Sequence, residues 1–152
     1  MENKKILYID MDGVLCDFDS KAAMPPKHVK DKYGDNLHRV PGFYRDLKPM
    51  PGAIDAFNKL CEHYDVYIAS TPSWINPSCW IDKRLWVQQY LGQNAYKKLI
   101  LTSNKGLLKG DYLIDDNTWN GAGDFEGKHI HFGTDHLFMN WDDVLEYFEN
   151  HA

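Results

Sequence analysis

Short apolar segments alternate with segments of helical periodicity along most of the chain. Apolar runs bounded by turn residues predict strands. These runs are residues 6–9, 65–70, 99–102, 112–114 and 128–132. Apolar residues at helical spacing predict helices. They lie at 53–61, from 78 or 79 to 91, and at 141–148. Strands that alternate with helices predict an α/β fold, in which a mainly parallel sheet carries helices on both faces.

The stretch after the first predicted strand, about residues 17–49, lacks a clear period. Turn signals interrupt it at 25–26 (PP), 34–36 (GDN) and 41–42 (PG). Residues 26–33 are compatible with a short helix between them. A length of 152 residues is usual for one domain. We therefore expect a single domain, 1–152, with a small insertion at about 17–49.

Polar side chains follow four of the predicted strands. Asp10 and Asp12 follow the predicted strand at 6–9. Ser70 and Thr71 lie at the end of the strand at 65–70, residues 102–105 lie at the end of the strand at 99–102, and residues 115–116 follow the strand at 112–114. In a parallel sheet these ends meet at the carboxyl edge, where open α/β sheets bind ligands. Clustered carboxylates repel one another unless a cation or a shared proton relieves them. The pattern predicts a hard metal beside a carboxylate nucleophile, a hydroxyl and a lysine, which suits phosphoryl transfer.

Composition and charge narrow the class of protein. The hydrophobic fraction of 43% allows a packed core, and no apolar run approaches the roughly 18 residues of a membrane span. The first apolar run is too short for a signal peptide, so we expect a cytoplasmic protein without a membrane partner. A net charge of −5 without a basic block argues against binding of long nucleic acid. The widely spaced Cys16, Cys61 and Cys79 predict free thiols.

Five segments carry a resemblance to a known family. They are residues 10–18 (DMDGVLCDF), 41–44 (PGFY), 70–72 (STP), 101–105 (LTSNK) and 113–116 (LIDD). The first contains the pattern D-x-D-G-[VT] of the haloacid dehalogenase-like phosphohydrolases. Together, in this order, they resemble the 5′(3′)-deoxyribonucleotidases of that superfamily. The resemblance implies a three-layer Rossmann-like α/β fold with a small helical cap after the first strand, and a phosphatase activity.

The resemblance also implies catalytic roles. Asp10 would attack phosphorus and become an aspartyl-phosphate. Asp12 would protonate the leaving nucleoside oxygen and then deprotonate the hydrolytic water. Ser70 takes the position of the hydroxyl in the second motif, and Thr71 beside it is a further candidate for phosphate binding. Lys105 would balance the charge of the phosphate and of Asp10.

The cofactor that the resemblance implies is Mg²⁺. Its ligands would be Asp10, the backbone carbonyl of Asp12, and the pair Asp115 and Asp116, one of them directly and the other through water. Asp116 is our choice for the direct ligand.

The implied substrate is a nucleoside monophosphate, held partly by the insertion. By position, Phe18, Phe43 and Tyr44 would line the base and sugar pocket, although each ring is equally suited to the core of the insertion. Trp74 and Trp119 follow two of the strand ends and are further candidates for pocket walls.

Several alternatives stay open. A phosphatase of another small metabolite, such as a sugar phosphate, would use the same motifs. A catalytically silent binding domain is a third reading, against which the presence of both Asp10 and Asp12 argues. Ser103 stands where the related human enzymes have an arginine, which removes one phosphate contact. His129 and His131 share a strand face that we expect to face solvent rather than to bind zinc. The base, the sugar, the phosphate position, and a monomeric or dimeric state are not determined.

Overall fold

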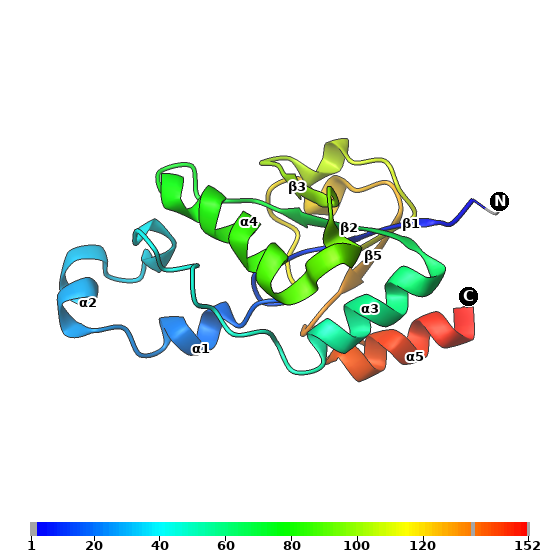
Figure 1. Cartoon of the computed structure of the whole chain (residues 1–152), viewed down its shortest axis with the longest axis horizontal. Helices are drawn as coiled ribbons and strands as arrows, with labels where there is room; N and C mark the ends of the chain where they lie inside the picture. The colour runs from blue at the N-terminus through cyan, green and yellow to red at the C-terminus, as the bar shows by residue number, and fades with distance from the viewer. Residues whose placement is uncertain (1–2, 135, 152) are drawn as a thin grey trace.

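A computed structural model describes residues 3–134 and 136–151 of the chain. Its centre is a five-stranded parallel sheet with the strand order β3-β2-β1-β4-β5 (Figure 1). The strands are β1 (Ile6–Ile9), β2 (Asp65–Ser70), β3 (Leu99–Leu101), β4 (Tyr112–Asp115) and β5 (Lys128–His131). Each lies within a residue of its predicted bounds, and the predicted α/β fold is confirmed.

Five α-helices and four short 3-10 segments accompany the sheet in the described part of the chain. The α-helices are α1 (Phe18–Ala22), α2 (Lys27–Tyr33), α3 (Ala53–His63), α4 (Pro77–Leu91) and α5 (Trp141–His151). The 3-10 segments are η1 (Leu37–Arg39), η2 (Gly92–Ala95), η3 (Lys105–Leu107) and η4 (Ala122–Asp124). The α4 helix begins with Pro77 and ends at Leu91. The next residue, Gly92, has a φ of +61°, a conformation that favours glycine.

The two faces of the sheet are covered differently. Leu7 and Ile9 of β1 belong to the main core, together with the buried residues of α3, α4 and α5. Tyr8 faces the other way and packs with Ala122 and Phe125 of the η4 region. Right-handed crossovers put α3 and α4 on one face. The later connections, 102–111 and 116–127, run over the opposite face and are too short for long helices. The sequence predicts helices on both faces, but on this second face the described part of the chain carries 3-10 segments instead.

Residues 17–49 project from the carboxyl edge of the sheet and carry α1, α2 and η1 (Figure 1). This segment, here called the cap, leaves and re-enters the body at one place. The Asp17 amide donates to the Lys48 carbonyl at 2.7 Å, and the Met50 amide donates to the Leu15 carbonyl at 2.8 Å. These two hydrogen bonds hold the first and last residues of the cap side by side, next to the loop that follows β1.

The chain order across the sheet creates a binding crevice beside β1. From β1 the chain builds outward through β2 to β3, and then returns to the other side of β1 with β4 and β5. Ligands of open α/β sheets bind at such a switch point, outside the carboxyl ends of the strands. The residues that follow β1 and β4 are therefore the ones best placed for chemistry.

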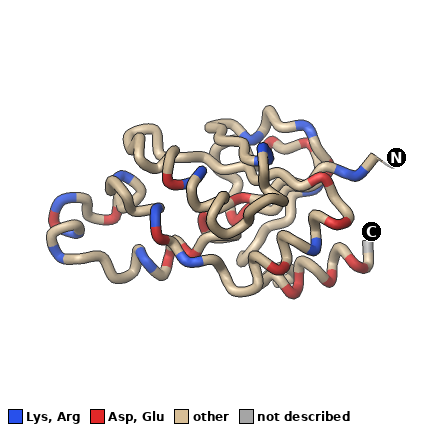
Figure 2. Tube along the Cα trace, viewed as in Figure 1, with Lys and Arg blue, Asp and Glu red and all other residues tan. Residues whose placement is uncertain are grey.

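Charges and thiols complete the description. Figure 2 shows basic residues along α2 in the cap and acidic residues along α5, with the two signs mixed elsewhere in that view. Cys16, Cys61 and Cys79 are free, as predicted. None of the described helices combines the length and apolar character needed to cross a membrane.

Candidate active site

The loop after β1 is a tight turn that carries the first two aspartates. Asp10 extends the ladder beyond β1, because its amide donates to the Ile114 carbonyl at 2.9 Å. The chain then turns around the Met11 carbonyl, which accepts the Cys16 amide at 2.8 Å. The turn leaves Asp10 buried at the sheet edge and places Asp12, which is 29% exposed, beyond it.

Gly13 permits this loop to approach the end of β4. Its φ is +80°, and a Cβ there would lie 2.2 Å from Oδ2 of Asp116. Both the backbone conformation and the contact therefore require glycine. The glycine of the sequence motif thus brings the Asp10 loop against the acidic pair after β4.

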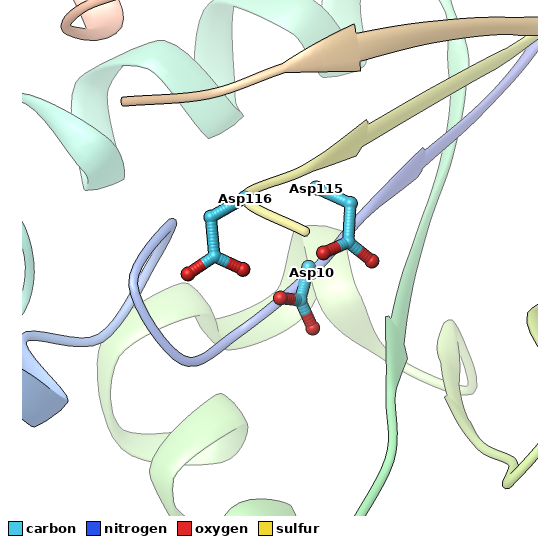
Figure 3. A group of neighbouring side chains, drawn as sticks. All are labelled: Asp10, Asp115 and Asp116. Carbon is cyan, nitrogen blue, oxygen red and sulfur yellow. The ribbon is translucent and has the colours of Figure 1, made fainter. Parts of the chain in front are cut away.

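Three carboxylates converge from β1 and β4. Asp10, Asp115 and Asp116 each offer an oxygen within 4.8 Å of the others (Figure 3). Burial, followed by the charges of Asp10 and Asp115, raises the pKa of Asp116 to about 8. Burial also raises the pKa of Asp10, against the opposing effect of Lys105. The group thus holds excess negative charge that a cation would relieve.

Lys105 is the ammonium group that faces this acidic group. Its Nζ donates to Oδ1 of Asp10 at 2.9 Å and to Oδ2 of Asp115 at 2.6 Å. Burial alone would lower the pKa of Lys105, but the two carboxylates more than offset this and raise it. The lysine is therefore charged at neutral pH and fixes the orientation of Asp10.

A second buried lysine, Lys83 of α4, forms an ion pair with Asp12. Its Nζ donates to Oδ2 of Asp12 at 3.1 Å and to Oγ of Ser70 at 2.7 Å. It also lies 4.7 Å from the ring centre of Tyr44. Burial raises the pKa of Asp12 although Lys83 opposes this, and Oδ1 of Asp12 is buried without a hydrogen bond in the structure described.

Sequence reasoning missed Lys83. It lies on the buried face of α4 with Cys79, Trp86 and Val87. The sequence carries no periodic signal for it, because apolar and polar residues of α4 do not separate onto two faces and the neighbouring Asp82 is buried as well.

The predicted hydroxyl residues have different surroundings. Ser70 is 1% exposed and accepts its hydrogen bond from Lys83 beside Asp12. Thr71 lies in the same cleft, but its Oγ1 donates to the Thr102 carbonyl at 2.7 Å. Its proton is therefore already used, so Thr71 would meet phosphate through its backbone or after a rearrangement.

A cleft of about 570 Å³ opens above these groups. Phe18 and Tyr44 line it from the cap side, and Trp74 and Trp119 line it from the loops after β2 and β4. Phe43 lies behind this wall. Its ring is buried and packs 5.1 Å from the Phe18 centroid, so it supports the wall without lining the cleft.

The histidines of β5 take no part in a metal group. His129 and His131 stack with their ring centroids 3.9 Å apart, and both are partly buried. Within residues 3–134 and 136–151, Asp10, Asp115 and Asp116 form the group able to hold a metal. The face of β5 that carries these two histidines, which the sequence predicts to face solvent, is therefore only partly exposed.

The fold of the chain is that of a solved haloacid dehalogenase-like protein. The structure matches the crystal structure of YfnB of Bacillus subtilis, a protein provisionally assigned as a HAD-hydrolase and solved bound to magnesium. The TM-score is 0.64, the sequence identity is 11%, and the match covers 96% of this chain and 99% of that one.

Residues 23–144 match the family described as 5′ nucleotidase, deoxy (Pyrimidine), cytosolic type C protein. A protein of Vibrio phage KVP40 is 52% identical over 145 residues, which are 95% of this chain and 85% of that protein. A Staphylococcus aureus protein is 31% identical over 174 residues, covering 95% of this chain and 96% of its own. Both bear the name 5′(3′)-deoxyribonucleotidase as a provisional assignment. The chain belongs to this family of phosphoric monoester hydrolases, which confirms the resemblance.

Proposed function

We propose that the protein is a Mg²⁺-dependent phosphatase that dephosphorylates nucleoside monophosphates through an aspartyl-phosphate intermediate formed at Asp10. One observation carries the proposal. Asp10 and Asp12 lie on the floor of one cleft, and each is held by its own buried lysine, Lys105 and Lys83. Two carboxylates in separate, fixed environments suit the separate roles of nucleophile and acid–base group.

Asp10 is suited to attack phosphorus. Lys105 holds one of its oxygens at 2.9 Å, so the carboxylate is fixed at the end of β1 and faces the cleft. The same ammonium would contact a phosphate oxygen and reduce the repulsion between two anions. Attack by the carboxylate forms the bond from oxygen to phosphorus as the bond to the nucleoside oxygen breaks.

Asp12 is suited to supply and remove the proton. Lys83 holds Oδ2, whereas Oδ1 is buried without a hydrogen bond in the described structure. In the first step, Oδ1 would give its proton to the leaving nucleoside oxygen. In the second step, the same oxygen would take a proton from the water that attacks the aspartyl-phosphate.

Replacement of Lys83 by methionine is expected to lower kcat for a nucleoside monophosphate by roughly tenfold to a hundredfold. Loss of a hydrogen bond to a charged group costs about 1.5–3 kcal/mol, and Asp12 would lose its orientation. Because p-nitrophenol leaves with little need for a proton, p-nitrophenyl phosphate should be affected less. Steady-state kinetics on both substrates measure this, with the exposed Arg84→Met as matched control. Equal losses on both substrates would show that Lys83 does not act through Asp12.

The acidic group fits a hard divalent cation. Its donors are carboxylate oxygens, which Mg²⁺ prefers, and Asp116 has a pKa raised to about 8. The two carboxylate oxygens of Asp115 already accept hydrogen bonds from Lys105 and from the Asn117 amide. Asp116 is therefore the better direct ligand, together with Asp10 and the Asp12 carbonyl. Bound there, Mg²⁺ would neutralise phosphate charge and orient the phosphate.

Removal of divalent metal by EDTA is expected to abolish turnover, and added Mg²⁺ should restore it. Mg²⁺ should also raise Tm, and by more at pH 8 than at pH 6, because the cation competes with the proton that Asp116 retains up to about pH 8. Thermal unfolding at both pH values measures binding without relying on activity. Full turnover after exhaustive chelation would refute the metal requirement.

The nucleoside part of the proposal is supported by the aromatic lining of the cleft. Phe18 and Tyr44 line one side of it above the catalytic floor, and aromatic faces stack on bases of any kind. Phosphate release from a panel of 5′- and 3′-monophosphates of ribose and deoxyribose nucleosides, beside sugar phosphates, tests the substrate class. Higher kcat/KM for the sugar phosphates than for every nucleotide would replace the nucleoside assignment.

A further inference from the structure

One buried carboxylate of α4, that of Asp82, has no role in the catalytic machinery described above. Its side chain is 1% exposed, and its Oδ1 accepts a hydrogen bond from Nε of Arg45 at 3.2 Å. Oδ2 is buried and has no hydrogen-bond partner in the described part of the chain. A buried carboxylate that is only half satisfied costs folding free energy, and an apolar side chain of similar size often fits such a position better. The ion pair with the cap residue Arg45 therefore calls for a reason other than stability.

This pair belongs to a row of contacts between the cap and one side of α4. Residues four apart lie on the same face of a helix, and three residues with this spacing each contact the cap. The Ser78 Oγ accepts the Gly42 amide at 2.9 Å, Asp82 accepts Arg45 at 3.2 Å, and the Trp86 Nε1 donates to the Leu47 carbonyl at 2.8 Å. Residues 42–47 of the cap therefore run along α4 in a fixed register.

The contacts of the catalytic site lie one residue away on both segments. Lys83 follows Asp82 on α4, and Tyr44 precedes Arg45 in the cap. The Lys83 ammonium lies 4.7 Å from the centre of the Tyr44 ring and donates to Oδ2 of Asp12 at 3.1 Å. Tyr44 lines the cleft, whereas Asp82 and Arg45 are not among the described residues that line it. Because Tyr44 and Arg45 are joined by one peptide bond, a shift of Arg45 along α4 would move the Tyr44 ring off this ammonium.

We propose that Asp82 and Arg45 are positioning residues for the reaction. They hold the Tyr44 ring against Lys83, and Lys83 keeps the Asp12 carboxylate oriented for proton transfer. This rests on the acid–base role proposed for Asp12. The ring attracts the ammonium through its π face and shields it from water, so the ammonium stays with Oδ2 of Asp12. The ion pair thus links the position of the cap to the acid–base group without contacting the substrate.

Replacement of Asp82 by asparagine is expected to lower kcat for a nucleoside monophosphate by about tenfold, because Asp12 loses its orientation. Single-turnover release of p-nitrophenolate from p-nitrophenyl phosphate should slow much less, because that leaving group needs little protonation. Tm should hardly change, since a neutral amide costs less to bury than a carboxylate. The double variant Arg45→Met/Asp82→Asn should lose no more kcat than Asp82→Asn alone, because the two residues act as one pair. Lys27→Met is the matched control and should keep kcat, since its ion pair with Asp31 joins two exposed residues of α2.

A crystal structure of Asp82→Asn tests the positioning without any substrate. The centre of the Tyr44 ring should lie farther from the Lys83 ammonium than 4.7 Å, and an unmoved ring would overturn the proposal. Unchanged kcat would overturn it as well, and so would equal losses for both leaving groups, which would show that the pair does not act through Asp12. If the ring moves while the unaltered enzyme hydrolyses no nucleoside monophosphate, the positioning stands and the proposed nucleotidase function fails.

Discussion

Replacement of Asp10 by asparagine is expected to lower kcat by more than about 10⁴-fold, the scale seen when a covalent nucleophile is removed. The carboxamide has nearly the same size and still accepts a hydrogen bond from Lys105, so geometry is retained while nucleophilicity is lost. Burial of Asp10 disfavours its charge, and the neutral amide should therefore leave the fold intact. Single-turnover kinetics with a nucleoside monophosphate measure the loss, and circular dichroism checks the fold.

Retention of near-normal turnover by this variant would exclude Asp10 as nucleophile. Asp111→Asn is a useful control, because Asp111 lies outside the cleft and accepts the Ile6 amide at 2.9 Å. That change should affect stability at most, while kcat stays close to its original value.

Replacement of Asp12 by asparagine is expected to lower kcat by about 10²–10⁴-fold, the usual contribution of general acid–base catalysis. The amide has no acidic proton for the leaving oxygen and cannot deprotonate water. Lys83 would keep Ser70 as an acceptor, since that bond is 2.7 Å long. The first chemical step should be slowed less for aryl phosphates, and the second step should be slowed equally for all substrates.

Rapid mixing with p-nitrophenyl phosphate separates the two steps. A burst of nitrophenolate followed by slow turnover is the expected record for Asp12→Asn. Equal slowing of phosphorylation for aryl and nucleoside leaving groups would show that Asp12 does not protonate the leaving oxygen.

The strand-end residues could be predicted from sequence because their signal is local. An apolar run followed directly by Asp10, Ser70 or Asp115 marks a buried strand and the polar group at its end. The parallel sheet then brings these ends together without further information, because sequential strands joined by crossovers share one direction. Lys105 also belongs to this strand-end pattern, and the family pattern gave its role; its contacts to two of the carboxylates agree with that placement.

Lys83 could not be assigned because its role exists only in the folded chain. It lies 71 residues from Asp12 in sequence, and nothing near it resembles a catalytic motif. For Phe43, in contrast, the sequence suggested a contact with substrate that the structure does not place at the cleft. Its position beside Tyr44 gave both rings the same predicted role, yet neighbouring residues point differently, and the structure places only Tyr44 at the cleft. Side-chain direction in an irregular insertion has no period from which it can be read.

The 3-10 segments on the second face of the sheet could not be predicted from the sequence either. Alternating strands and helices predict helices on both faces, but the connections around Lys105 and Ala122 are short and rich in glycine. Only the folded chain shows that Ala122 of η4, Phe125 after it and Leu108 after η3 pack in one cluster with Tyr8 and Leu113.

The most direct test of the account is to trap the phosphoryl group on the enzyme. The Asp12→Asn variant should accumulate the intermediate, because its hydrolysis is slowed. Acid quenching during turnover of p-nitrophenyl phosphate with Mg²⁺, followed by digestion and mass spectrometry, should find one phosphoryl group on Asp10. The same treatment of Asp10→Asn should find none. A phosphoryl group on another residue, or product formed without any phosphorylated enzyme at the earliest times, would show that the reaction does not pass through an aspartyl-phosphate at Asp10.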